Sequence, residues 1–134
     1  MCRILMLSRL ILAVLLLATG PAVAQQKSGQ RLFIIFFKPW SADLGKNSLK
    51  VVQQAAAAAK AIPLSQVTVL GYADTEGSTK ANLDLTQQRV DVVRGALVRA
   101  GYPGDQISVK AQGSVAPIGD AQESRRVEIT IRAP

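Results

Sequence analysis

The segment from residue 81 to residue 100 carries apolar residues at helical spacing, and an arginine interrupts their face. The apolar positions are Leu85, Val92, Val93, Ala96, Leu97 and Ala100. At about 100° per residue they share one side of a helix, and Arg89 falls within that side. Asn82, seven residues earlier, projects onto nearly the same line. Because an isolated charge is costly to bury, we expect the Arg89 guanidinium to meet an anionic partner.

An acidic residue stands at the end of the strand that precedes this helix. The run VTVLGYAD has the composition of a strand and ends in Asp74. Asp74, Asn82 and Arg89 are therefore predicted to form a small polar pocket where the strand meets the helix. Two structural interpretations stay open: an Asp74–Arg89 ion pair that needs no ligand, and an Asn82 that bonds only local backbone.

The N-terminus has the pattern of an export signal. Arg3 and Arg9 precede a short apolar core from Leu10 to Ala18, and Ala22-Val23-Ala24 has the small-x-small form of a signal-peptidase site. We expect residues 1–24 to be a cleaved signal peptide, with export to the periplasm as the consequence. Retention as an uncleaved inner-membrane anchor is the alternative, although the core is shorter than the roughly 20 residues that a spanning helix needs.

Composition excludes several kinds of chemistry. The only cysteine is Cys2, inside the signal, and the chain has no histidine. The remaining 110 residues therefore offer no disulfide, thiolate nucleophile or imidazole, and we predict no metal site and no cofactor. Their net charge is +5 (14 basic against nine acidic residues) and is dispersed along the chain. We expect no nucleic-acid partner and no transmembrane segment in the exported chain.

Hydrophobic periodicity predicts one domain, residues 31–134, after a flexible lead-in over residues 25–30. The continuous apolar run Arg31–Lys38 indicates a buried strand, and the alanine-rich stretch from about 47 to 62 indicates a helix that Pro63 ends. Further strands are expected at 66–71, 107–111 and 127–131, with the second helix at about 81–100, capped by Ser78 or Thr79 and ended at Gly101. The order is β-α-β-α-β-β, which is an α+β fold with two helices covering one face of a sheet.

Two strings of residues resemble a known family, the OmpA-like peptidoglycan-binding domain. They are GYADTEGSTKANLDLTQQRVDVVRGALVRAGY and SRRVEITI. The positions that match the family pattern are Gly71, Asp74, Gly77, Asn82, Leu85, Arg89, Val93, Leu97, Gly101, Arg125, Arg126, Val127 and Glu128. The resemblance covers nearly all of residues 31–134 and implies the OmpA-like mixed sheet. Tyr72, Ala73 and Ser124 depart from the family's His, Thr and Asn.

The resemblance implies a periplasmic module, associated with the cell wall and outer membrane, that holds peptidoglycan through the diaminopimelate of its stem peptide. Asp74 then accepts from the ligand's ammonium, while Arg89 meets its carboxylate through a planar fork. Asn82 orients the ligand, and Arg125 adds a second cationic contact. For Arg126 we expect an ordinary solvated strand end that shares a face with Glu128. Nothing in this set attacks a bond, so we expect no enzyme.

Alternatives to wall binding stay open. One alternative is a domain that has the OmpA-like fold but no longer binds the wall, and that acts as an assembly subunit of an envelope protein complex. The departures at Tyr72, Ala73 and Ser124 favour this alternative. A wall hydrolase needs paired acids or an activated nucleophile, and no such constellation stands out. Phe33, Phe36 and Phe37 are expected in the core, and Trp40 is slightly more in keeping with core than with a ligand contact.

Overall fold

The computed structural model describes residues 29–114 and 120–134. The predicted signal peptide and most of the lead-in lie outside the described residues, as do residues 115–119 of the loop before the last strand. Within the described parts, no helix combines the length and the apolar character that crossing a membrane requires.

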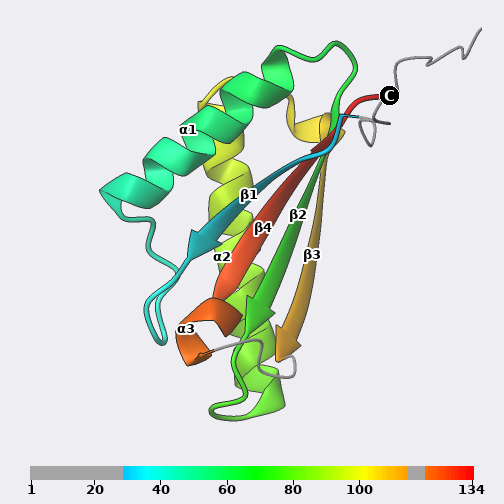
Figure 1. Ribbon diagram of the computed structural model, residues 1–134. Helices are drawn as coiled ribbons and strands as arrows, with labels where there is room; N and C mark the ends of the chain where they lie inside the picture. Colours follow the sequence, from blue (N-terminus) through cyan, green and yellow to red (C-terminus); the bar gives the residue numbers. More distant parts are fainter. Residues whose placement is uncertain (1–28, 115–119) are drawn as a thin grey trace, which may run out of the picture.

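Four strands form one mixed sheet in the order β1-β4-β2-β3 (Figure 1). The strands are β1 (Arg31–Phe36), β2 (Gln66–Ala73), β3 (Ile107–Ser114) and β4 (Arg126–Arg132). β4 pairs antiparallel with β1 on one side and with β2 on the other, and β2 pairs parallel with β3. The α+β class and the mixed sheet predicted from the sequence are confirmed.

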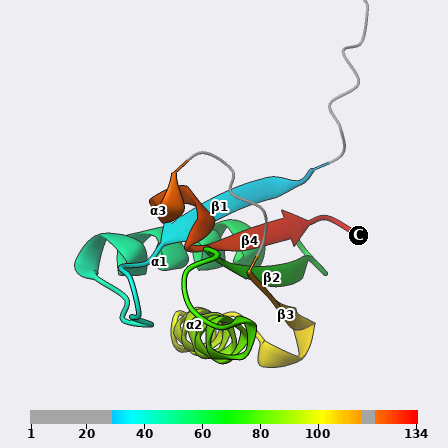
Figure 2. The same cartoon turned by 90° about the horizontal axis from the view of Figure 1, so that it is seen from below.

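The two long helices cover one face of this sheet (Figure 2). Helix α1 (Lys46–Lys60) contacts β1 and β4, whereas α2 (Thr79–Arg99) contacts β2 and β3 most extensively. Ser78 caps α2 by accepting a hydrogen bond from the Ala81 N–H at 3.1 Å. The chain leaves α2 through Gly101, whose φ of +95° favours glycine. Two short elements were not predicted: the 3₁₀ helix η1 (Gly104–Gln106) and α3 (Ala121–Ser124).

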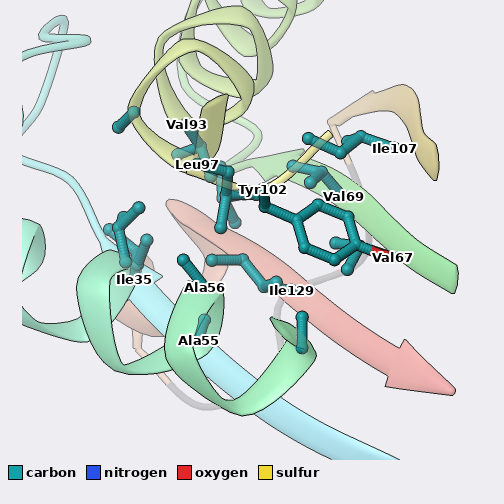
Figure 3. Packing of buried hydrophobic residues seen from close by; sticks show 14 of the residues in the cluster. Ile35, Ala55, Ala56, Val67, Val69, Val93, Leu97, Tyr102, Ile107 and Ile129 are labelled. Atoms are coloured by element: carbon teal, nitrogen blue, oxygen red, sulfur yellow. The ribbon is translucent and has the colours of Figure 1, made fainter. Parts of the chain in front are cut away.

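The core lies between the sheet and the two helices (Figure 3). Alternate residues of β2 and β4 point into it, and facing residues of α1 and α2 complete it. Its fully enclosed members include Val67, Val69, Ile129, Val52, Ala55, Val93 and Leu97. Arg89 lies on this same face of α2 and is 0 % exposed, which confirms the predicted inward orientation. The apolar periodicity of α2 therefore identified the correct face.

The first strand differs from its prediction. β1 is an edge strand, and its residues Leu32, Ile34 and Phe36 point away from the helices and are exposed. An apolar run without alternation suggested burial on both faces, but neither of the two long helices covers this side of β1, where, among the described elements, only the short α3 lies near Phe36. The expectation of a buried strand is therefore wrong for one face, and the expectation that Phe36 lies in the core is wrong as well. Phe37 is buried and Phe33 partly so, as expected.

Candidate functional site

The predicted site residues meet at one end of the sheet, in the lower part of Figure 1, where β1 and β2 end and α2 and β4 begin. A small pocket of about 10 Å³ lies there. Its lining residues are Pro39, Trp40, Ala73, Asp74, Glu76, Asn82, Leu85, Arg89 and Arg125. The structure thus brings together all four residues that the sequence nominated: Asp74, Asn82, Arg89 and Arg125.

Asp74 pairs with Arg125, not with Arg89. Its Oδ2 lies 2.9 Å from Arg125 Nη1, and its Oδ1 accepts a hydrogen bond from the Glu76 N–H at 3.1 Å. Arg125 Nε also donates to the carbonyl of Phe37 at 3.3 Å, so three segments of the chain meet at this pair. The Asp74–Arg89 ion pair considered from the sequence is therefore wrong, because the arginine before β4 occupies that position.

Within the part of the chain that the structure describes, Arg89 is buried and has no carboxylate partner. Its Nε donates to the carbonyl of Ser41 at 2.8 Å and its Nη2 to the carbonyl of Lys38 at 3.0 Å. The guanidinium carbon lies 5.1 Å from the centre of the Phe37 ring. Its Nη1 is buried and has no hydrogen-bond partner among the described residues. The expected anionic partner is thus replaced by two backbone carbonyls, which leave the Nη1 nitrogen of a charged group without an acceptor.

The surroundings of Arg89 lower its pKa to about 10. Burial is the main cause, since removing the guanidinium from water penalises its charged form. The positive charge of Arg125 lowers the pKa further, and the negative charge of Asp74 opposes both effects. Arg89 therefore stays protonated at neutral pH while its charge is incompletely balanced.

Asn82 holds the loop between β2 and α2 in place. Its Nδ2 lies 3.3 Å from the Asp74 carbonyl, 2.8 Å from the Glu76 carbonyl and 3.0 Å from Ser114 Oγ. These contacts fix the backbone that carries the Asp74 carboxylate and tie it to the end of β3. Asn82 thus bonds local backbone, but not local backbone alone, because it also donates to Ser114 at the end of β3; it lines the pocket as well.

Two residues differ from their sequence-based interpretations. Trp40 is 56 % exposed and lines the pocket, so the preference for a core position is wrong. Arg126 shares a face with Glu128 as expected, but it is buried; it pairs with Glu128 at 2.9 Å and lies 4.2 Å over the Tyr72 ring. Tyr72 thus packs with Arg126 and does not line the pocket, so this departure from the family pattern falls outside the site.

The charges of the pocket suit a ligand with two opposite charges. Two guanidinium groups face one partly buried carboxylate, and Glu76 lies exposed at the edge of the pocket. A carboxylate on a ligand can accept from Arg89 Nη1, whose donor is otherwise unused. Each oxygen of Asp74 accepts one hydrogen bond and keeps a further lone pair, so an ammonium can add without breaking the Arg125 pair.

Comparison with known proteins gives a family match across the site. The sequence pattern of the OmpA family matches residues 36–129. The probable lipoprotein YiaD of Escherichia coli is 32% identical over 124 residues, which cover 84% of this chain and 56% of that protein. The peptidoglycan-binding protein ArfA of Mycobacterium tuberculosis is 36% identical over 88 residues, covering 61% of this chain and 27% of ArfA. The chain thus spans about half of the first relative and about a quarter of the second.

Solved structures share the architecture. The peptidoglycan-associated lipoprotein from Burkholderia pseudomallei has a TM-score of 0.68 and 25% sequence identity, with 75% of this chain and 90% of that one covered. The cell wall anchor of the type VI secretion system from Pseudomonas aeruginosa has a TM-score of 0.64 at 22% identity, covering 78% of this chain and 82% of that one. At this identity, the second match supports the fold alone.

Proposed function

This chain belongs to the OmpA family, and we propose that it is a non-catalytic periplasmic module that holds peptidoglycan noncovalently through the diaminopimelate of the stem peptide. The observation that carries the proposal is the unused, buried Nη1 of Arg89 beside the Asp74–Arg125 pair. The names of ArfA and of the Burkholderia lipoprotein, both of which refer to peptidoglycan, support the ligand class.

The ligand's chemistry matches the arrangement of the pocket. The end of a diaminopimelate side chain carries an ammonium and a carboxylate on one carbon. Asp74 accepts from the ammonium, and Arg89, with Arg125 beside it, binds the carboxylate. The same ligand with lysine in place of diaminopimelate lacks the carboxylate, so it leaves Arg89 Nη1 without a partner and binds more weakly.

No group in this set is placed for bond cleavage. Asp74 is held by Arg125 and the Glu76 N–H and can only accept further hydrogen bonds. The other polar side chains that line the pocket are two guanidinium groups, the Asn82 amide and the exposed Glu76 carboxylate. Such groups orient and hold a ligand. Export by residues 1–24 brings the module to the compartment where the wall is found.

Co-sedimentation with purified diaminopimelate-type sacculi tests the proposal. The wild-type protein is expected to pellet with the sacculi, and Asp74→Asn to stay in the supernatant. Asp74→Asn keeps the shape of the side chain and an oxygen for the Glu76 N–H, so the pocket backbone is preserved. Asp84→Asn is the matched control, because it removes the same charge from an exposed helical pair with Lys80 and should pellet like wild type.

A second candidate function is assembly with another envelope protein. The exposed row Leu32, Ile34 and Phe36, on the face of β1 turned away from α1 and α2, favours it, since contiguous exposed apolar side chains mark interaction surfaces. If wild type and Asp74→Asn both stay in the supernatant, wall binding through this pocket is wrong, and assembly through β1 becomes the leading function.

A further inference from the structure

Trp40 occupies a backbone position that ordinarily belongs to glycine or asparagine. Residues Lys38–Ser41 form a turn closed by the Ser41 N–H donating to the Lys38 carbonyl at 3.3 Å, with Pro39 as its second residue. Trp40, its third residue, has a φ of +54°, in the left-handed region. The third position of such turns favours residues without a bulky side chain. A tryptophan there is strained, and the strain needs a compensating gain.

Core burial does not supply that gain. The side chain of Trp40 is more than half exposed, and its indole lies against Gly77 in the loop between β2 and α2. A Cβ on Gly77 would lie 2.5 Å from Trp40 Cη2, so the contact requires a glycine there. The indole therefore bridges the two loops that border the pocket. The indole thus shapes the border of the pocket and contributes little to the core.

Arg89 fixes the turn that carries this tryptophan. The two carbonyls that accept from Arg89 belong to Lys38 and Ser41, the first and last residues of the turn. One guanidinium thus reaches the pocket and holds the backbone on both sides of Trp40. The proposed carboxylate-binding group is therefore hydrogen-bonded to the backbone that flanks Trp40.

The pocket is too small for its proposed ligand while the indole lies on Gly77. A volume of about 10 Å³ has room for at most one water molecule. The ammonium and carboxylate of a diaminopimelate head need more space, so a bordering group has to move. Among the aromatic and apolar residues that line the pocket, Trp40 has the half-exposed side chain that can turn outward without opening the core.

We propose that Trp40 is a specificity-determining residue of this site: its indole moves off Gly77 to admit the zwitterionic head and then packs on the methylene chain behind it. This inference rests on the proposed function for the identity of the ligand. It adds that Trp40 is the residue that contacts the methylene chain of the ligand. A flat aromatic face excludes water from a methylene chain and discriminates against shorter side chains.

Trp40 is the only tryptophan of the chain, so it reports its own movement. Titration of the purified protein with a soluble diaminopimelate-containing muropeptide is expected to shift the tryptophan emission saturably. Trp40→Gly is expected to bind the muropeptide about tenfold more weakly by calorimetry, whereas Trp40→Phe keeps most of the affinity. The melting temperature of Trp40→Gly should stay close to that of wild type, because glycine relieves the strained φ.

Leu64→Gly is the matched control. Leu64 has a φ of +56°, is 75 % exposed and lies at the opposite end of β2 from Asp74, so the substitution relieves similar strain far from the pocket. It is expected to bind the muropeptide like wild type. A saturable emission shift with weakened Trp40→Gly binding supports the inference.

Two results overturn it while leaving wall binding intact. They are calorimetric binding with no change in emission, and a folded Trp40→Gly that binds as tightly as wild type. If Trp40→Gly does not fold, the emission of the wild-type protein and the affinity of Trp40→Phe still decide. A wild-type protein that binds neither muropeptide nor sacculi rejects the proposed function itself, and the inference with it.

Discussion

Arg89 joins local stability to the proposed binding site in a single side chain. It reaches out of the α2 core face, donates to two carbonyls of the turn after β1 and keeps one donor for the pocket. A buried arginine with no carboxylate partner reduces stability, because its charge is removed from water without full compensation. In the proposed function, a ligand carboxylate that binds Arg89 Nη1 offsets part of this loss of stability.

The lowered pKa of Arg89 makes the free energy of unfolding depend on alkaline pH. The folded-state pKa of about 10 lies below the ordinary value of 12.5, so the unfolded chain binds more protons between these values. The penalty is fully present below pH 10, and stability contributed by this group rises as pH increases beyond it. The stability of wild type relative to Arg89→Met should therefore rise by about 1 kcal/mol between pH 9 and pH 11.

Urea unfolding of both proteins at the two pH values measures this change. Arg99→Met is the control, because it removes an exposed arginine from the same helix. Its change in stability between the two pH values gives the general effect of alkaline pH, which is then subtracted. A wild-type advantage that is the same at pH 9 and pH 11 contradicts the assigned charge penalty.

The sequence predicted where the four site residues lie better than it predicted their hydrogen-bond partners. Helical spacing alone placed Arg89 inward, and the strand end placed Asp74 beside α2. The Arg125 pairing depends on how β4 approaches β2, which follows from the sheet order. Arg89 donates to the backbone carbonyls of Lys38 and Ser41. Every residue has such a carbonyl, so the sequence does not indicate which ones Arg89 contacts.

At the scale of elements, close packing of α2 on β2 sets the position of the site. Gly71 lies in β2 directly beneath the helix, and a Cβ there would come within 2.6 Å of both Thr86 Cγ2 and Val90 Cγ1. Both residues are fully buried, so neither can move away cheaply. Gly71 therefore allows the approach that brings Arg89 and Asn82 to the end of β2.

Two glycine-to-alanine substitutions are expected to change stability in opposite directions. Gly71→Ala should lower the free energy of unfolding by about 1–3 kcal/mol through overpacking. Gly95→Ala, in the C-terminal part of α2, should raise it by about 0.5–1 kcal/mol, since its added Cβ meets only the flexible end of Arg99 and alanine favours the helix. Denaturant unfolding measures both. Equal effects of the two substitutions contradict the close-packing argument.

The element boundaries show which signals were decisive. Both long helices and the three later strands occupy nearly the predicted ranges, because alternation, helical spacing and the Gly101 stop agree there. The two-sided burial of β1 was wrong, since an apolar run does not reveal whether a strand lies at the edge of a sheet. The short α3 is held by an Asp120 cap, with Oδ1 accepting from the Glu123 N–H at 2.9 Å, and no apolar period marks it.

At the scale of the whole domain, the last strand is the one on which the sheet depends. β4 pairs with β1 and β2 at once, and its Val127, Ile129 and Ile131 are fully buried. Without β4, β1 has no neighbour in the sheet, and the core loses its centre.

A chain that ends after Ser124 should therefore not fold. Amide exchange is expected to show no protected strand, and the far-ultraviolet circular dichroism to lose its sheet component. Ending the chain after Arg132 is the control, because it removes only Ala133 and Pro134, beyond β4, and should keep the native spectrum. Persistent protection of β2 and β3 without β4 contradicts this dependence.

The pairing of the first strand with the last also sets when the domain can form during synthesis. Arg31 is registered with Ile131, so the closing contact spans nearly the whole domain and has a high contact order. Helices α1 and α2 can appear early, but the sheet has to wait until β4 has emerged. A nascent chain of this kind cannot close its sheet before β4 has been made, so the domain forms only after its own residues have all been translated.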